Sequence, residues 1–299
     1  MNNSVAFLNG NWIPNLELKI AYDDLGFLMG VTITERLRTF RGQAFRVNEH
    51  IDRLRHSLEI VGWDATRICE NIGAAVNEFS KRNANLVMEG DDWNIVGFVT
   101  PGRTTDAANP TLGIYGFPIP FSQWAHQYRS GVDAIIADVR QVPANCWPPE
   151  LKCRSRLHYY LADRQAAQRS PDTRAILLDQ QGNIGEGSTA NVLAFFKGKG
   201  LVTPLLEKVL PGVSQQVLLE LAEVQGIPCH RRDISPQEFA EADEIFFTST
   251  SICLLPVVRL NDLPVGEGRP GPEFTQLLKS WSELVGVDIA TQAQQFSVR

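Results

Sequence analysis

The chain has 299 residues, of which 43% are hydrophobic and 21% charged, and its 28 basic and 34 acidic side chains give a net charge of −6. These values are ordinary for a globular protein, and the length predicts one large or two medium domains. The acidic balance disfavours a nucleic-acid partner, which needs a basic face. No apolar run reaches the roughly 18 residues of a membrane span, so no membrane partner is expected.

The cysteines and the N-terminal residues indicate the cellular compartment of the protein. An odd number of scattered cysteines without a CxxC pair is typical of reduced thiols rather than of disulfides or a zinc site. The N-terminus lacks the basic and apolar regions of a secretory signal. We therefore expect a cytoplasmic protein without a bound metal. The cysteines are Cys69, Cys146, Cys153, Cys229 and Cys253.

The first third of the chain predicts a β-hairpin, further strands and two helices. Residues 5–14 alternate around Asn9-Gly10, a dipeptide typical of a two-residue hairpin turn. A helix that Asn48 can cap and Gly62 can end carries an apolar stripe with helical spacing. Strands are predicted over 31–40, 44–47, 94–100 and 111–117, and a second helix over 66–82.

A segment with two prolines and no apolar period predicts a domain boundary. We assign residues 119–130 to a linker between a small domain over 1–118 and a large domain over 131–299. In the large domain, strands mixed with single helices favour an α+β arrangement over a doubly wound parallel sheet. Its elements are strands over 131–140, 175–179, 191–196 and 244–248, and helices over 154–169, with Leu157 and Leu161 inward, and over 214–225.

A glycine-rich stretch near the C-terminus matches the G-x-G-x-x-G pattern of dinucleotide-binding proteins. It runs from Gly266 to Gly271 and is interrupted by Pro270. No strand-then-helix context is predicted around it, and too little chain follows for a βαβ unit. We expect a surface turn there.

Two segments contain residues suited to an anionic ligand. Arg53 lies at the edge of the apolar stripe of the first helix, where it is either an anion-binding residue or a surface arginine with a buried stem. Leu210-Pro-Gly212-Val-Ser214 opens a helix, and the N–H groups of a helix N-terminus suit a phosphate. Ser214 is equally suited to be an ordinary helix cap.

Two further segments contain hydroxyl groups and a candidate nucleophile. Thr248-Ser249-Thr250 ends an apolar strand with hydroxyls that bond phosphate oxygens or satisfy a turn. Lys152 follows a proline-rich loop beside Leu151, where partial desolvation would favour an uncharged, nucleophilic amine. The alternative for Lys152 is a solvated surface charge.

In their order and spacing these segments resemble the class IV aminotransferases, the fold-type IV group of pyridoxal-phosphate-dependent enzymes. The group includes branched-chain aminotransferases, D-amino acid aminotransferases and 4-amino-4-deoxychorismate lyases. The resemblance covers nearly the whole chain. It is carried by the Asn9-Gly10 hairpin, Tyr22-Asp-Asp-Leu-Gly26-Phe-Leu-Met-Gly30, Asn48-Glu-His50-Ile-Asp-Arg53-Leu54, Leu151-Lys152, Gly182-Asn-Ile-Gly-Glu186-Gly-Ser-Thr-Ala-Asn191, Leu210-Pro-Gly212-Val-Ser214 and Ala242-Asp-Glu-Ile-Phe-Phe-Thr-Ser-Thr250.

The resemblance implies an α+β, two-domain fold-type IV enzyme that binds pyridoxal 5'-phosphate. A small N-terminal α/β domain would precede a larger C-terminal domain with a β-barrel-like sheet core. Such enzymes act on small-molecule substrates, an amino acid and a 2-oxo acid, and they are homodimers or larger assemblies with the active site near the subunit interface. We expect the same of this chain.

The resemblance also implies a role for each matching residue. Lys152 would form the Schiff base with the cofactor and then move the proton between the substrate Cα and the cofactor. Glu186 would lie against the pyridine nitrogen and keep it protonated. Arg140 would approach the cofactor's 3'-oxygen. The cofactor phosphate would be bound by Arg53, by the N–H groups of Val213 and Ser214, and by the hydroxyls of Ser249 and Thr250.

This sequence departs from the group's pattern around the substrate. Thr34 replaces an aromatic pocket residue, and strand alternation puts Arg36 on the same face as Thr34. The Arg36 guanidinium would either hold a substrate carboxylate or belong to an exposed basic face. Arg103 is a second candidate for that carboxylate. Leu157 stands where branched-chain aminotransferases carry a tyrosine, and Gln215 stands where an arginine is usual.

Three functions are compatible with these residues. The preferred one is an aminotransferase that exchanges an amino group between an amino acid and a 2-oxo acid. A lyase that releases pyruvate from a chorismate-derived amine is the alternative, and Lys152 would serve both. A cofactor-binding protein without turnover is disfavoured, because lysine, glutamate and phosphate-binding residues are all present.

Overall fold

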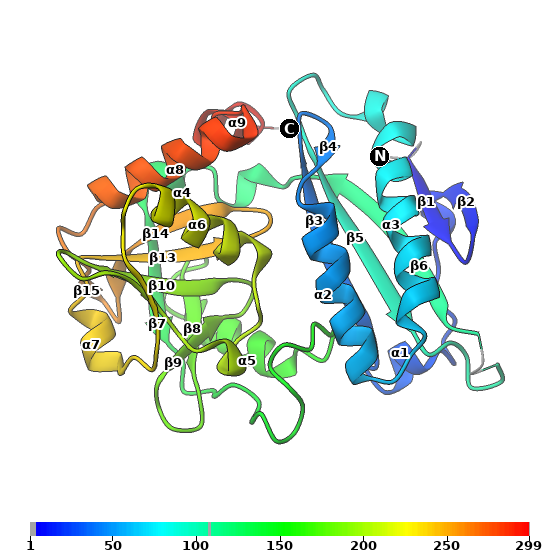
Figure 1. The fold of residues 1–299 in the computed structure, drawn as a ribbon, viewed down its shortest axis with the longest axis horizontal. Helices are drawn as coiled ribbons and strands as arrows, with labels where there is room; N and C mark the ends of the chain where they lie inside the picture. Colours follow the sequence, from blue (N-terminus) through cyan, green and yellow to red (C-terminus); the bar gives the residue numbers. More distant parts are fainter. Residues whose placement is uncertain (1–3, 107–108, 299) are drawn as a thin grey trace. The chain divides into compact units, whose positions relative to one another are not determined.

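The computed structural model describes residues 4–106 and 109–298. The chain divides into an N-terminal unit, Met1–Pro120 with Leu151–Ser155, and a C-terminal unit, Phe121–Glu150 with Arg156–Arg299 (Figure 1). Across those described ranges, no helix combines the length and apolar character that crossing a membrane requires.

An antiparallel sheet of six strands, in the order β2-β1-β6-β5-β3-β4, forms the N-terminal unit. The predicted hairpin is confirmed: β1 pairs with β2 around Asn9 and Gly10, which both have positive φ as a tight two-residue turn requires. The strands are β1 Val5–Leu8, β2 Asn11–Pro14, β3 Ile33–Phe40, β4 Gln43–Ala44, β5 Trp93–Thr100 and β6 Thr111–Pro118. The helical segments are η1 Asn15–Glu17, α1 Leu25–Leu28, α2 Val47–Ile60, α3 Ala65–Arg82 and η2 Ala84–Leu86.

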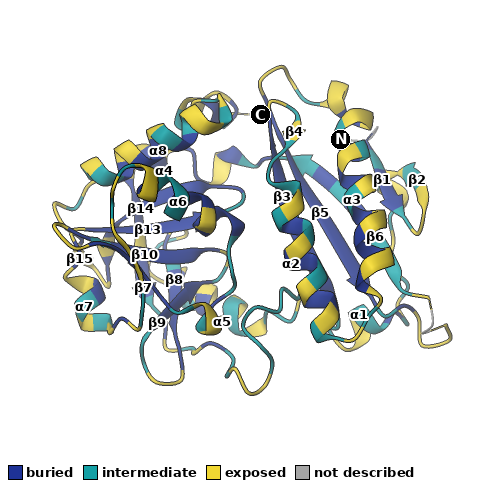
Figure 2. Cartoon of the chain, viewed as in Figure 1, coloured by how far each residue is buried: buried dark blue, intermediate teal, exposed yellow. Residues whose placement is uncertain are grey.

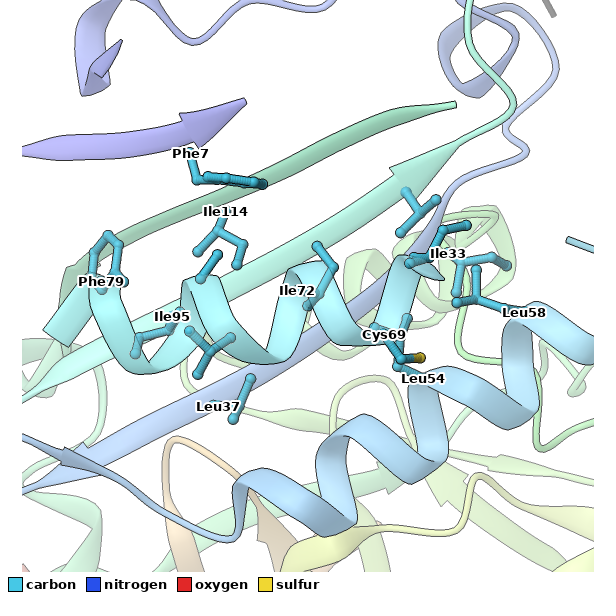
Figure 3. Packing of buried hydrophobic residues seen from close by; sticks show 14 of the residues in the cluster. Phe7, Ile33, Leu37, Leu54, Leu58, Cys69, Ile72, Phe79, Ile95 and Ile114 are labelled. Carbon is cyan, nitrogen blue, oxygen red and sulfur yellow. The ribbon is translucent and has the colours of Figure 1, made fainter. Parts of the chain in front are cut away.

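Helices α2 and α3 pack on one face of this sheet and form its core. Their apolar stripes and the inward residues of β3, β5 and β6 interdigitate in one buried cluster (Figure 3). Burial of one such side chain stabilises the fold by about 1.5–3 kcal/mol. The members labelled in Figure 3 are Phe7, Ile33, Leu37, Leu54, Leu58, Cys69, Ile72, Phe79, Ile95 and Ile114.

The start of α2 differs from the sequence prediction. The strand predicted over 44–47 ends at Ala44, and the helix already begins at Val47. Arg46, in the left-handed region at φ 53°, takes the N-cap position, so Asn48 lies inside the first turn and does not cap the helix. The chain leaves strand β4 through this left-handed residue, which starts the helix earlier than the side-chain pattern indicates.

A mixed sheet of nine strands forms the C-terminal unit. Along the path β12-β11-β10-β13-β14-β7-β8-β9, the pairs β11–β12, β14–β7 and β7–β8 are parallel and the others antiparallel, and β15 pairs with β14. Most strand residues are buried, whereas the helices keep one exposed face (Figure 2). The strands are β7 Val132–Ile136, β8 Arg174–Leu178, β9 Ile184–Gly187, β10 Asn191–Phe196, β11 Gly200–Thr203, β12 Cys229–Arg231, β13 Glu244–Ser249, β14 Cys253–Leu260 and β15 Leu263–Pro264.

This sheet curls back on itself. β9 lies at one end of the strand path, yet it contacts β10 near the other end, and Gly187 N–H donates to the Ala190 carbonyl in the short connection between them. The α+β class and the barrel-like sheet core are therefore confirmed. The helical segments are η3 Phe121–Gln123, α4 Gln127–Ser130, α5 Leu157–Ala166, η4 Leu206–Lys208, α6 Val213–Val224, α7 Pro236–Ala240, α8 Pro272–Val285 and α9 Ile289–Gln295.

Helix α5 is shorter than the helix predicted over 154–169 and buries a different face. Leu157 is 69% and Leu161 48% exposed, so both were wrongly predicted to point inward. Ala162 and Ala166 are fully buried against β7 and β8, and Tyr159 packs beside the same cluster. Small side chains allow the helix to approach the sheet closely, and this close packing outweighs the stripe of larger leucines.

Two other stretches need comment. Residues 121–130, within the expected linker, form η3 and α4 and bury Phe121, Trp124 and Tyr128 in the C-terminal unit. The glycine-rich stretch forms turns, as expected, but a helix does follow it, because α8 begins at Pro272. The N–H groups of Glu273 and Phe274 in that helix donate to the Glu244 carboxylate at 2.8 and 2.9 Å, so this N-terminus is bonded within the protein.

Candidate functional site

A buried ion pair links β3 to α2 in the N-terminal unit. Arg53 donates from Nε to Glu35 Oε2 at 2.9 Å and from Nη2 to Oε1 at 2.5 Å. His50 Nδ1 lies 3.1 Å from Oε1. Arg53 is 8% exposed, Glu35 1% and His50 2%. The arginine expected to bind a phosphate is therefore held in place by an internal carboxylate.

Arg53 determines the protonation state of Glu35 in this cluster. Burial by itself would raise the pKa of Glu35, but the Arg53 guanidinium and the hydrogen bond from His50 outweigh it and hold that pKa well below its ordinary value of 4.5. Burial lowers the pKa of His50, against the opposing influence of Glu35. Since a neutral imidazole carries no charge, Arg53 is the cation that keeps Glu35 ionised at neutral pH.

Lys152 is attached to the same β3–α2 layer through its backbone. The Thr34 N–H donates to the Lys152 carbonyl at 3.0 Å, and Cys153 forms an antiparallel bridge with Ile33. The Lys152 N–H donates to Ser57 Oγ at 3.2 Å, and Ser57 lies one turn after Arg53 on the buried face of α2. Lys152 and Arg53, far apart in sequence, are thus both held by α2 in one unit.

Strand alternation separates Lys152 from the apolar core. Leu151 and Cys153 pack on the core cluster, which places Lys152 on the opposite face of its segment. Ile33 and Leu37 of β3 also belong to that cluster, so Thr34 and Arg36 lie on the face that Lys152 shares.

Two predicted substrate residues on that face have well-defined surroundings. The Thr34 hydroxyl donates to the Gly97 carbonyl at 2.9 Å and is buried. The Arg36 guanidinium lies 5.7 Å from the centre of the Phe117 ring, a cation–π distance. The Arg36 side chain is half-buried and lies beside this aromatic ring.

Arg103 has a different environment. Its Nε donates to both oxygens of Asp23, at 2.9 and 3.1 Å, and its side chain is 55% exposed. This hydrogen bond lowers the pKa of Asp23. Arg103 belongs to an exposed ion pair in the connection that follows β5, whereas Arg36 lies within the sheet.

The carboxylate of Glu186 is the centre of a second cluster, in the C-terminal unit. Glu186 lies in β9 and is 6% exposed. Its Oε1 accepts from the Tyr159 hydroxyl at 2.6 Å. Its Oε2 accepts from the Leu210 N–H at 3.1 Å and from Asn191 Nδ2 at 3.3 Å. Donors from α5, β10 and the segment before α6 therefore orient one buried carboxylate.

Asn191 joins this carboxylate to two other predicted segments. Its Nδ2 also donates to the Leu210 carbonyl at 2.8 Å. A Cβ built at Gly212 would collide with Asn191 Oδ1, so glycine is needed for this close approach. Asn191 is also paired with Thr248 across β10 and β13. Glu186, the start of α6 and the end of β13 therefore meet around one asparagine.

The helix that starts at this point has the features of an anion-binding N-terminus. Gly212 is the N-cap of α6, and no side chain caps the helix there, so Ser214 is not the ordinary cap that remained possible. The N–H groups of Val213 and Ser214 lie in the first turn, where the helix dipole favours an anion. Ser249 and Thr250 directly follow Thr248 and are partly exposed.

Other predicted residues have structural partners. Arg140 Nη1 donates to the Asp179 carbonyl at 3.2 Å, which holds it at the β8–β9 turn. Gln215 donates to Thr203 Oγ1 at 2.7 Å and accepts from Arg231 Nη1 at 3.2 Å. The guanidinium of Arg231, from β12, therefore lies beside Gln215.

Tyr159 and Asn191 are two of the residues for which sequence reasoning found no role, as are Glu35 and Ser57. Asn191 lies within a recognised motif, but nothing in the pattern shows which groups its amide bonds. Tyr159 belongs to the buried stripe of α5, which the spacing of the larger leucines concealed. Both become visible only through contacts between separate elements.

The chain is similar to a known protein family and to several known proteins. The family model described as amino-transferase class IV matches residues 32–260. A putative branched-chain-amino-acid aminotransferase from Methanocaldococcus jannaschii is 28% identical, over 91% of this chain and 93% of the relative. A D-alanine aminotransferase from Bacillus licheniformis is 26% identical, over 89% and 92% of the two chains. The chain spans 52% of the length of branched-chain-amino-acid aminotransferase-like protein 2 from Arabidopsis thaliana, at 27% identity over 96% of this chain.

Solved structures share the fold. A branched-chain amino acid aminotransferase from Escherichia coli matches with a TM-score of 0.86 and 23% identity, over 95% of each chain. The T.th. branched-chain amino acid aminotransferase with pyridoxamine 5'-phosphate matches with a TM-score of 0.83 and 21% identity, over 95% of this chain and 94% of that one. The fold-type IV assignment is confirmed.

We predict that Glu35→Gln destabilises the N-terminal unit in a pH-dependent way. Removing one partner of a buried ion pair costs about 3–5 kcal/mol at neutral pH, which a lower urea midpoint of unfolding would report. Because the folded-state pKa of Glu35 is depressed, its stabilisation is present above its ordinary value of 4.5 and is lost as the pH falls below it. The difference between wild type and variant should therefore narrow in acid.

The matched control is Glu59→Gln, an exposed glutamate on the same helix, which should leave the midpoint unchanged. A Glu35→Gln difference of equal size at neutral and acid pH would contradict the role given to the ion pair.

Proposed function

Because this chain belongs to the class IV aminotransferase family, whose members use pyridoxal phosphate, we propose that it moves an amino group between a small amino acid and a 2-oxo acid, with Lys152 and Glu186 as its catalytic residues. The observation that carries this proposal is the meeting of Glu186, the start of α6 and the end of β13 around Asn191.

The residues of the C-terminal unit fit the two ends of the cofactor. The uncapped N-terminus at Val213 and Ser214, with the hydroxyls of Ser249 and Thr250 nearby, suits its phosphate. The buried Glu186 carboxylate suits its ring nitrogen, because a carboxylate there keeps the nitrogen protonated. When bound, the cofactor withdraws electrons from the substrate Cα, which makes the Cα proton removable.

Two residues of the N-terminal unit have further proposed roles. Lys152 provides the amine that binds the aldehyde and then moves the proton at the substrate Cα. Its backbone is fixed by Thr34 and Ser57, so the side chain starts from a rigid position. Arg53, oriented by Glu35, is proposed to add a positive charge for the cofactor phosphate.

Arg36 is the proposed substrate-carboxylate residue. It lies on the face that Lys152 and Thr34 share, and its guanidinium lies against Phe117. Arg103 is the weaker choice, because Asp23 already accepts two hydrogen bonds from it. The relatives described above are named for branched-chain amino acids and D-alanine, which supports small amino acids as substrates. Because those relatives are aminotransferases, the lyase alternative is not favoured.

A second copy of this chain is the proposed partner. Apolar side chains around α1 are strongly exposed, with Tyr22 at 81%, Phe27 at 71% and Met29 at 69%. Exposed apolar residues that cluster in one segment are typical of a protein–protein interface. A cytoplasmic location stays a prediction that rests on the five single cysteines.

We expect borohydride reduction of the cofactor-loaded protein to fix the cofactor on the peptide that contains Lys152. Lys152→Ala should prevent this fixation and abolish amino transfer, because no other amine would be positioned for it. Peptide mass spectrometry after reduction measures the first result. A Lys152→Ala protein that is still labelled at one defined lysine would refute the assignment.

Arg36→Ala should raise the KM for the amino acid about tenfold or more, with a smaller effect on kcat, because a charge-assisted hydrogen bond to the carboxylate is lost. Arg36→Lys should restore part of the affinity, since it keeps the charge but not the planar fork. The matched control is Arg41→Ala, an exposed arginine just after the same strand. An unchanged KM in Arg36→Ala would remove Arg36 from the substrate site.

Light scattering coupled to gel filtration should give twice the mass of one chain. Phe27→Lys should shift the protein toward monomer, because it places a charge in the proposed interface. Leu263→Lys, at a residue that is 67% exposed in the C-terminal unit, is the control and should leave the mass unchanged. A wild-type monomer would contradict the proposed dimer.

A further inference from the structure

Tyr159 makes a short hydrogen bond to the carboxylate of Glu186. Its hydroxyl donates to Glu186 Oε1 at 2.6 Å, while the Leu210 and Asn191 donors reach the other oxygen, Oε2. The two ends of the carboxylate are therefore held from different elements, with α5 on one side and β10 and the α6 approach on the other. Without the Tyr159 hydroxyl, Oε1 would lose this hydrogen bond, which helps to orient the carboxylate.

The phenol ring itself is firmly held. The His158 ring centre lies 3.9 Å from that of Tyr159, and the Arg156 guanidinium lies 5.1 Å over the Tyr159 ring. Arg156 Nη2 also bonds the Ser188 carbonyl, in the connection between β9 and β10. Ser188, two residues after Glu186 in the chain, thus helps to hold Arg156 over the ring whose hydroxyl bonds Glu186. These contacts restrict the orientation of the Tyr159 ring.

We propose that Tyr159 is a positioning residue that sets the proton balance between Glu186 and the cofactor's ring nitrogen. This role rests on the proposed function, in which Glu186 faces that nitrogen. A donor to a carboxylate stabilises its charged form and lowers its affinity for a proton. The shared proton then stays on the ring nitrogen, where its positive charge draws electrons from the substrate Cα.

The test compares Tyr159→Phe with Tyr160→Phe in the full-length, cofactor-loaded protein. Tyr159→Phe keeps the ring and its contacts with His158 and Arg156 and removes only the hydroxyl. Tyr160→Phe removes the hydroxyl of the neighbouring residue, which is 59% exposed. NMR of cofactor labelled at its ring nitrogen with a heavy nitrogen isotope reports the protonation of that nitrogen directly. Cofactor affinity, the half-reaction rate with one amino acid, and thermal unfolding of the cofactor-free protein complete the comparison.

We expect Tyr159→Phe to shift the ring-nitrogen resonance toward that of a neutral pyridine and to slow the half-reaction about tenfold. Thermal unfolding of its cofactor-free form should stay close to wild type, and Tyr160→Phe should match wild type in every measurement. A Tyr159→Phe protein with the wild-type resonance and rate would overturn this role while leaving the proposed function intact. Wild-type protein that takes up no cofactor would overturn both.

Discussion

The amide of Asn191 is the interaction on which the candidate site most depends. It bonds the Glu186 carboxylate and the Leu210 carbonyl with one nitrogen, and its oxygen lies against Gly212. An amide can do this because it has two N–H donors and a carbonyl acceptor on one planar group. The ring-nitrogen end and the phosphate end of the proposed cofactor site are therefore fixed to one another by a single side chain, which is itself held in the sheet by its pairing with Thr248.

A buried ion pair has the corresponding function in the N-terminal unit. Arg53 is oriented by Glu35, and the same face of α2 receives the backbone of the Lys152 segment through Ser57. Two residues with proposed functions thus depend on one helix face, and that face is attached to β3 by charge-assisted bonds as well as by apolar packing. Isolating such a pair from water makes each partner costly to remove, so the arrangement favours precision of placement over simple stability.

Long regular elements could be predicted from the sequence, but the contacts that individual side chains make mostly could not. The hairpin at Asn9-Gly10, helix α3 and strands β5, β6 and β10 follow from local patterns and are found where they were expected. The inward face of α5 was wrong, because Ala162 and Ala166 pack more closely on the sheet than the leucines would. The start of α2 was wrong, because a left-handed Arg46 takes the place of the expected cap. In both cases a tertiary or backbone constraint overruled a valid local preference.

The sequence by itself determined the family, the order of the elements and the residue types available for chemistry: a lysine, a glutamate, a glycine-opened helix and clustered hydroxyls. These are encoded by spacing along the chain, which a reader of the sequence can measure directly. Only the tertiary structure decided that Asn191 joins three of these segments, that Asp23 pairs with Arg103, and that Tyr159 donates a hydrogen bond to Glu186. Each of these contacts joins different elements, and the choice of partner depends on how closely the sheet and helices pack, which no local pattern contains.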